Sequence, residues 1–128
     1  MATTVEICID VPDLGKARAF YVAAFGLSEE ASPVPDVVVL ATDNLRICLL
    51  EKEEGSRPSP SSGDIRRYRR HWTPVHLDFR TSDIHASLER VLAAGAVAES
   101  DVLENKHGSW VTCADPFGNG FCLIQPNG

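Results

Sequence analysis

The sequence contains no apolar run that approaches the ~18 residues needed to cross a membrane. Its first residues, MATTVEICID, are acidic where a secretory signal would be basic and then apolar. Positive charge is scarce as well, because 12 Lys and Arg stand against 18 Asp and Glu, a formal charge of −6. Such a chain repels a polyphosphate backbone. We therefore expect a soluble, cytoplasmic protein that binds neither membranes nor nucleic acid.

The four cysteines lack the pattern of a disulfide-stabilised secreted scaffold. Cys8, Cys48, Cys113 and Cys122 each lie inside an apolar, strand-like run rather than in a loop. Reduced thiols are therefore the expected state. With 128 residues, the chain is long enough to bury about two-thirds of its unfolded surface. This length suits one compact domain, or two half-size units that share a core.

The sequence repeats itself. Residues 5–24 align with residues 75–94 at a constant offset of 70, and Gly26 matches Gly95 after a slip of one residue. RICLLE at 46–51 aligns with GFCLIQ at 120–125. The matched pairs are Val5 with Val75, Asp13 with Asp83, Leu14 with Ile84, and Cys48 with Cys122. Self-similarity of this kind indicates two copies of one supersecondary unit.

Each copy has the pattern of a strand, a helix and further strands. In VEICID and VHLDFR, apolar and polar residues alternate, which is typical of a half-buried strand. Asp13 and Asp83 are placed as helix N-caps, and Gly26 and Gly95 as C-caps. The expected strands are residues 5–10, 29–32, 37–42 and 46–51 in the first copy, and 75–80, 98–102, 109–114 and 120–125 in the second.

The stretch between the copies is rich in Gly, Ser, Pro and Arg, which is typical of a linker. We therefore divide the chain into a first module at residues 1–52, a linker at 53–74 and a second module at 75–128. The linker carries a concentrated basic run, RRYRRH at 66–71. We expect this run to be solvated. The alternative is a loop that closes over a site and meets an anionic group of a ligand.

Three stretches carry a resemblance to a known family: VPDLGKARAFYVAAFGL, VHLDFRTSDI and DPFGNGFCLIQ. With the repeated βαβββ order, they resemble the vicinal oxygen chelate superfamily, which includes glyoxalase I, bleomycin-resistance proteins and extradiol dioxygenases. The resemblance implies an α+β fold of two tandem βαβββ modules that form an open, incomplete barrel around a cleft, the glyoxalase/bleomycin-resistance fold. It also implies a homodimer. Because this fold carries isomerases, dioxygenases and binding proteins alike, function depends on the site.

Members of this superfamily usually hold a divalent metal in the cleft, on the first and last strands of each module. The resemblance places the corresponding positions at Glu6, Cys48, His76 and Cys122. Metal-binding members generally have carboxylates where this chain has its two cysteines. Thiolates are soft ligands that favour zinc over the hard ions that suit an oxygen-rich site. We therefore expect no metal cofactor and two cysteines that act as small buried hydrophobes, with zinc held by all four residues as the alternative.

Two polar side chains are the candidate catalytic residues. His76 and Glu6 alternate with the apolar residues of their strands, so both belong to the face turned away from the helices. His76 can act as a ligand, a hydrogen-bonding group or a base, and a nearby Glu6 would complete a proton relay. The same sequence pattern would result if Glu6 and His76 formed an ordinary structural ion pair. Three aromatic residues are the candidate ligand-binding walls of the cleft, namely Trp110, Phe121 and Tyr21.

These observations favour a glyoxalase-like protein that binds a small organic molecule in the cleft without the usual metal. Such a protein would sequester its ligand, as bleomycin-resistance proteins do, or act as a metal-free enzyme. The alternative is a metal-dependent lyase, isomerase or dioxygenase of the glyoxalase I type. The missing carboxylate pair favours the first hypothesis. Whether the chain is an enzyme, and which molecule it binds, is left open.

Overall fold

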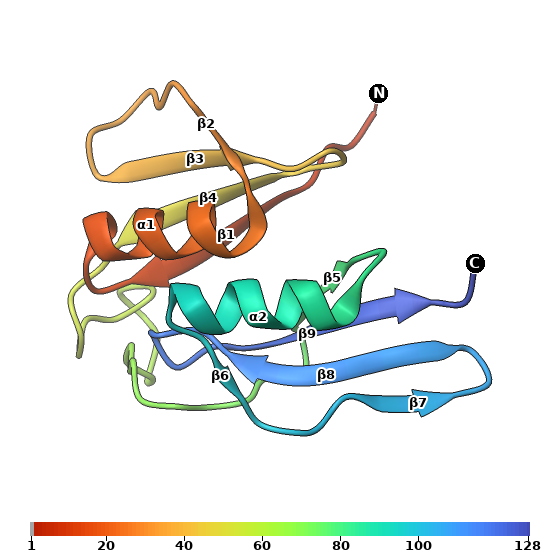
Figure 1. Cartoon of the computed structure of the whole chain (residues 1–128). Helices are drawn as coiled ribbons and strands as arrows, with labels where there is room; N and C mark the ends of the chain where they lie inside the picture. Colours follow the sequence, from red (N-terminus) through yellow and green to blue (C-terminus); the bar gives the residue numbers. More distant parts are fainter. Residues whose placement is uncertain (1) are drawn as a thin grey trace. The chain divides into compact units, whose positions relative to one another are not determined.

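The computed structural model describes residues 2–128, which divide into two compact units (Figure 1). The first unit comprises the chain up to Val22 together with Gly26–Tyr68, and the second comprises Ala23–Phe25 with Arg69–Gly128. The first unit contains β1 (Glu6–Val11), most of α1 (Leu14–Phe25), β2 (Ser28–Glu30), β3 (Val37–Ala41) and β4 (Arg46–Glu51). Its sheet has the order β1-β4-β3-β2, with β1 and β4 parallel.

The second unit repeats this arrangement. It contains β5 (Leu77–Arg80), α2 (Ile84–Ala94), β6 (Val97–Ala98), β7 (Leu103–Asn105), β8 (Gly108–Ala114) and β9 (Gly120–Pro126). The sheet has the order β5-β9-β8-β6, β7 pairs with β8, and β5 runs parallel to β9. The predicted α+β class and the two βαβββ modules are confirmed. Of the predicted linker, residues 53–68 lie in the first unit and residues 69–74 in the second.

Both helices begin and end at the predicted caps. The Asp13 carboxylate accepts a hydrogen bond of 3.0 Å from the backbone N–H of the third residue of α1, and Asp83 does the same for α2 at 3.1 Å. Gly26 ends α1 with φ 64°, a left-handed conformation that glycine adopts without the Cβ penalty of other residues. Gly95 ends α2 with φ 121°.

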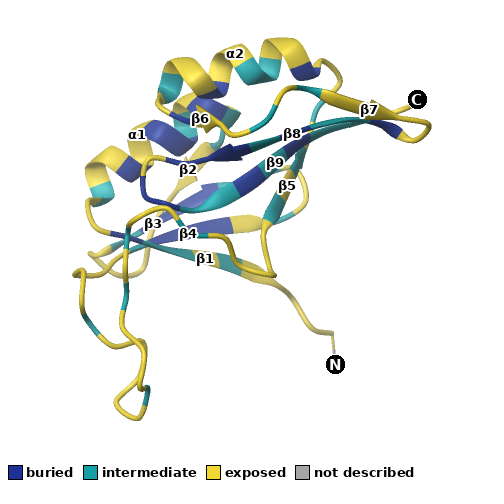
Figure 2. Cartoon of the chain, turned by 90° about the horizontal axis from the view of Figure 1, so that it is seen from below, coloured by how far each residue is buried: buried dark blue, intermediate teal, exposed yellow. Residues whose placement is uncertain are grey.

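Buried residues lie along one side of each helix and in the central strands (Figure 2). In α1 this side includes Ala17, Phe20, Tyr21 and Ala24. In α2 it includes Ile84 and Val91, whereas Leu92 is 40% exposed. The fully buried side chains of the strands are Val11, Leu40, Ile47 and Leu49 in the first unit, and Val111, Cys113 and Leu123 in the second.

An aromatic cluster explains why the last turn of α1 belongs to the second unit. The Phe25 ring stacks on Phe79 of β5, with ring centroids 3.7 Å apart. Phe121 of β9 meets both rings edge-on, at 5.5 Å and 5.8 Å. Edge-to-face and stacked rings add to the stability gained from burial alone. The cluster therefore anchors the end of α1 to the sheet formed by β5 and β9.

Two predicted strand boundaries are corrected. The strand expected at residues 75–80 begins at Leu77, and Val75 is 86% exposed. The pairing edge just before this point is taken by another segment, because His71 forms a parallel bridge with Asn119 and Leu77 then pairs with Phe121. The pairing of β5 with β9 therefore starts at Leu77.

The strand expected at residues 98–102 is replaced by two shorter ones, β6 and β7. Between them, the hydroxyl oxygen of Ser100 accepts the backbone N–H of Thr112 at 3.1 Å. A side chain thus takes the place of a ladder carbonyl and interrupts the strand. Within residues 2–128, neither helix has the length and apolar character of a membrane span.

The hairpin between β8 and β9 is built around one buried carboxylate. Asp115 is 4% exposed, and its Oδ1 accepts the backbone N–H groups of Phe117 and Asn119 at 2.8 and 2.9 Å. Its Oδ2 accepts the Asn119 side-chain amide at 3.0 Å. Three donors in the turn therefore depend on this side chain.

Replacing Asp115 should be costly because it leaves these donors without an acceptor in a buried turn. We expect Asp115→Ala to lower the free energy of unfolding by about 3 kcal/mol, measured by urea denaturation. Asp43→Ala, in the exposed turn between β3 and β4, is the matched control and should change stability by less than about 0.5 kcal/mol. Equal effects of the two substitutions would show that the carboxylate does not organise the turn.

Candidate functional site

In the second unit, three potential ligand groups converge on the half-exposed face of the sheet. Because β5 and β9 are parallel neighbours, Asp78 lies directly opposite Cys122. His76 Nε2 is 3.2 Å from Asp78 Oδ1. The donor atoms of His76, Asp78 and Cys122 all lie within 4.8 Å of one another. Imidazole, carboxylate and thiol together form a borderline-soft set of the kind that zinc accepts.

The thiol of this cluster is neutral at physiological pH. Burial raises the pKa of Cys122, a hydrogen bond with Thr112 lowers it, and the Asp78 carboxylate raises it further. The Thr112 hydroxyl lies 3.9 Å from the sulfur. Burial also raises the pKa of the neighbouring Cys113, on the core face of β8, to about 11. A cation that binds at Cys122 must therefore displace the thiol proton.

A short segment before β5, residues 70–72, holds the indole ring of Trp72 against this cluster, and we call this segment the strap. The ring of Trp72 lies 4.8 Å from the His76 imidazole between centroids, at an interplanar angle of 37°. The Arg70 guanidinium lies 5.6 Å from the indole centroid and makes a two-pronged ion pair with Glu99. Gly120 provides room for the strap, because a Cβ there would overlap the Trp72 ring. The indole thus limits the orientations open to His76.

In the first unit, the matching face carries a carboxylate and two thiols. Cys8 of β1 lies directly opposite Cys48 of β4, and the Cys48 thiol donates to Glu6 Oε2 at 3.8 Å. Burial raises the pKa of Cys48, and the neighbouring Cys8 thiol and Glu6 carboxylate raise it further because each disfavours a second negative charge. Cys8 is exposed and Cys48 is buried. This group therefore combines the Glu6 carboxyl group, one exposed thiol and one buried thiol.

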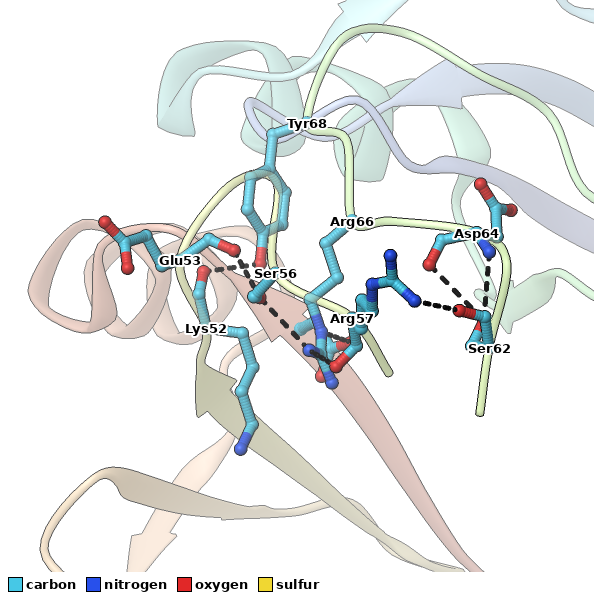
Figure 3. Close-up of polar contacts among 9 residues, drawn as sticks. Lys52, Glu53, Ser56, Arg57, Ser62, Asp64, Arg66 and Tyr68 are labelled. Carbon is cyan, nitrogen blue, oxygen red and sulfur yellow. Dashed lines mark hydrogen bonds and ion pairs between the residues drawn. The ribbon is translucent and has the colours of Figure 1, made fainter. Parts of the chain in front are cut away.

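The loop after β4 is tied to the same unit (Figure 3). Arg66 Nε lies 2.8 Å from Asp10 Oδ2, and its Nη1 donates to the carbonyl of Arg57 at 2.9 Å. The Tyr68 hydroxyl donates to the carbonyl of Lys52 at 2.7 Å. The Arg66 side chain is only 15% exposed, so the expectation of a solvated basic run is wrong at this residue. Its charge is compensated by the carboxylate that it meets.

The four predicted ligand positions thus form two pairs, one in each unit. Glu6 lies against Cys48, and His76 lies beside Cys122. A single site that combines all four residues stays a prediction, as does an acid–base relay between Glu6 and His76.

Of the three aromatic residues predicted to line a ligand site, one lies on the half-exposed sheet face and two lie in the core. Trp110 pairs with Ile124 and is half-buried on the same face of the second sheet as Cys122, so it stays a candidate ligand contact. Phe121 is 3% exposed and belongs to the aromatic cluster on the opposite face. Tyr21 is 2% exposed and packs edge-on against Phe20. Phe121 and Tyr21 are therefore core residues, because strand and helix periodicity do not distinguish a cleft wall from a core face.

Sequence reasoning missed three residues next to the candidate groups: Cys8, Asp78 and Trp72. A signal for the first two was present, since each follows a predicted ligand by two residues on the same strand face and the 70-residue offset matches one with the other. Trp72 had no such signal. It lies in the presumed linker, and only the folded strap brings it to His76.

The repeated βαβββ units and their strand-borne polar groups define an α+β protein of the glyoxalase/bleomycin-resistance type. Residues 6–124 match the family described as the glyoxalase-like domain. The chain belongs to this family, within the vicinal oxygen chelate superfamily. No curated protein matches the chain.

Several solved structures share the fold. The fosfomycin resistance protein FosX from Listeria monocytogenes has a TM-score of 0.74 at 21% identity, covering 99% of this chain and 95% of that one. A FosX mutant complexed with Mn(II) and 1S,2S-dihydroxypropylphosphonic acid has a TM-score of 0.71 at 21% identity, covering 97% and 90%. TnmS3, an antibiotic-binding protein from Streptomyces sp. CB03234, has a TM-score of 0.65 at 24% identity, covering 99% of both chains. At these identities the likeness establishes the fold.

The contact between Trp72 and Gly120 predicts that substitutions at these two positions have non-additive effects on the free energy of unfolding. Gly120→Ala should displace the Trp72 ring and lower the free energy of unfolding by about 1–3 kcal/mol, as overpacking does. In the Trp72→Ala background the same substitution should cost less, because the clashing ring is absent. Urea denaturation of the two single variants and the double variant gives the coupling energy. Gly63→Ala is the control, since no atom lies within 4 Å of its would-be Cβ. Additive effects at Gly120 and Trp72 would contradict the clash.

The Arg70–Glu99 pair predicts a specific pH dependence. The hydrogen bond from Arg70 is the main cause that lowers the pKa of Glu99 below 4.5. The pair therefore stabilises the folded state above pH 4.5 and loses its effect as pH falls through the lowered pKa. We expect Glu99→Gln to be less stable than the parent at pH 7, with a gap that narrows toward pH 3 in urea denaturation. Glu104→Gln, on the exposed β7, should show no such trend. A pH-independent gap at Glu99 would rule out the ion pair as its cause.

Proposed function

We propose that this chain binds a small organic molecule without the hard divalent metal that many members of its superfamily hold. The observation that carries the proposal is the pair of thiols, Cys48 and Cys122, at the closing-strand positions where metal-binding members have carboxylates. Burial raises the pKa of both, so both are neutral and unsuited to a hard cation.

The carboxylates near the two thiols do not make up for the missing oxygen ligands of a hard metal ion. Mn(II) prefers carboxylate, carbonyl and water oxygens. In the first unit, the Glu6 carboxylate already accepts the Cys48 thiol. In the second, the carboxylate of Asp78 lies against His76 and Cys122. The donor set of this chain therefore does not fit Mn(II), and no step of the proposed function involves it.

In this proposal, the ligand is held by side chains of the half-exposed sheet faces. His76 and Glu6 supply hydrogen bonds and, if a reaction follows binding, the acid and base. Trp110 supplies apolar surface, as aromatic residues do in ligand sites. The antibiotic-binding neighbour TnmS3 and the resistance protein FosX support a natural-product or small polar antibiotic as the ligand class. The proposal also includes a cytoplasmic location, as expected from the sequence, and the homodimer that the family resemblance implies.

The proposal predicts ligand binding that is independent of Mn(II). Thermal denaturation of chelator-treated protein with bleomycin, fosfomycin and a panel of other natural-product antibiotics should reveal a ligand that raises Tm. The shift should be the same in EDTA and in excess Mn(II), and His76→Ala should reduce it. Lys106→Ala, at the exposed β7–β8 turn, is the control. A shift that requires Mn(II), or no shift with any member of the panel, would contradict the proposal.

A second candidate function is favoured by the cluster in the second unit. His76, Asp78 and Cys122 could hold a zinc ion, and the chain would then be a metal-dependent lyase, isomerase or dioxygenase. A zinc ion bound there would act as a Lewis acid toward a substrate oxygen. The Trp72 ring, 4.8 Å from the His76 imidazole between centroids, would restrict the orientation of that ligand.

Zinc analysis separates the two candidates. If the second is right, protein purified without a chelator or a nickel column should contain one zinc per chain by plasma mass spectrometry. Asp78→Asn and Cys122→Ser should each lose it, whereas Cys48→Ser should keep it. A zinc-free parent protein that also fails to bind added Co(II), followed by its visible absorption, would rule out this candidate.

A further inference from the structure

We propose that Cys8 and Cys48 form a two-thiol site in the first unit for a soft, thiol-seeking metal ion of the Cu(I) type. This site is distinct from the His76–Asp78–Cys122 cluster and does not depend on the proposed function.

The sheet brings the two thiols to one face. Cys8 and Cys48 are direct partners in the parallel pair β1 and β4. Partners in adjacent strands have backbones about 4.8 Å apart and side chains on the same side. Cys8 is exposed and Cys48 is buried beside Glu6. An ion therefore reaches the pair from the solvent through Cys8.

The spacing favours a bridging ion over a direct sulfur–sulfur bond. A disulfide needs Cβ atoms about 3.8 Å apart, whereas neighbouring strands hold theirs near the interstrand spacing of about 4.8 Å. Metal–thiolate bonds are about 2.3 Å long, as in zinc sites, so one ion with two such bonds bridges sulfurs up to about 4.6 Å apart. The pair thus suits two-coordinate binding without displacement of either strand.

The surroundings select a soft ion. Thiolates are preferred by Cu(I) over the hard divalent ions. Each thiol loses its proton as its metal–sulfur bond forms, and no oxidation state changes. Glu6, which accepts the Cys48 S–H, is placed to take that proton, while the Cys8 proton leaves to water.

The second unit is a natural comparison. At the position that matches Cys8 it has Asp78, so Cys122 faces a carboxylate across the parallel pair instead of a second thiol. The two copies of the fold therefore present different donor sets on equivalent strands. A two-thiolate bridge is possible only in the first.

Competition for Cu(I) tests the proposal. Under anaerobic, reducing conditions, the folded protein should withdraw one Cu(I) per chain from its coloured complex with bicinchoninate. Cys8→Ser and Cys48→Ser should each weaken binding by more than about 100-fold, since loss of even an outer-shell partner costs metal sites 10- to 100-fold. Cys122→Ser, the matched closing-strand variant, should bind as the parent does. Retained binding in Cys8→Ser, or lost binding in Cys122→Ser, would overturn the proposal.

A second experiment uses the parent protein, so its result does not depend on whether a substituted protein folds. Protein with and without one equivalent of Cu(I) is alkylated with iodoacetamide and mapped by mass spectrometry. Bound Cu(I) should protect Cys8 at least tenfold in alkylation rate and leave the rate at Cys122 unchanged. Equal alkylation of Cys8 in both samples, or protection only at Cys122, would place the ion elsewhere and refute the two-thiol site.

Discussion

The parallel pairing of the first and last strands in each unit is the constraint on which the candidate sites depend. A parallel pair aligns side chains from distant parts of the chain on one face, in strict register. In the first unit it places Cys8 opposite Cys48, and in the second it places Asp78 opposite Cys122. Each cluster combines two residues that are two positions apart with a cysteine at least 40 residues further along the chain, so no short motif contains it. A slip of one residue in either register would move every one of these side chains to the opposite face.

Duplication of this arrangement gives two related faces with different chemistry. The first unit has a carboxylate and two thiols, and the second has an imidazole, a carboxylate and one thiol. The resemblance to the superfamily predicts that the cysteines of both units stand at positions where metal-binding members generally have carboxylates. On this interpretation, the chain keeps the scaffold of its family and changes the hardness of the donors that the scaffold presents.

The strap between the units shows how the surroundings of a site can lie outside the repeat. Trp72 and Arg70 belong to a segment with the composition of a linker, yet the indole packs over Gly120 and against His76. Arg70 is held by Glu99, and Arg66 by Asp10. Composition indicated flexibility for this segment because Gly, Ser and Pro are frequent in it. Its aromatic and charged side chains instead find partners that only the fold supplies.

The amino-acid sequence by itself determined the repeat, the two helices with their Asp and Gly caps, and the order of strands and helices along the chain, because these depend on local periodicity and on residue types with strong conformational preferences. The family followed from the resemblance of three sequence stretches. The tertiary structure decided which predicted residues meet. It buried Phe121 and Tyr21 in the core, left Trp110 on the half-exposed face and brought Asp78 and Trp72 to His76. Those outcomes depend on interstrand register and on long-range packing, which a periodic pattern along one strand does not encode.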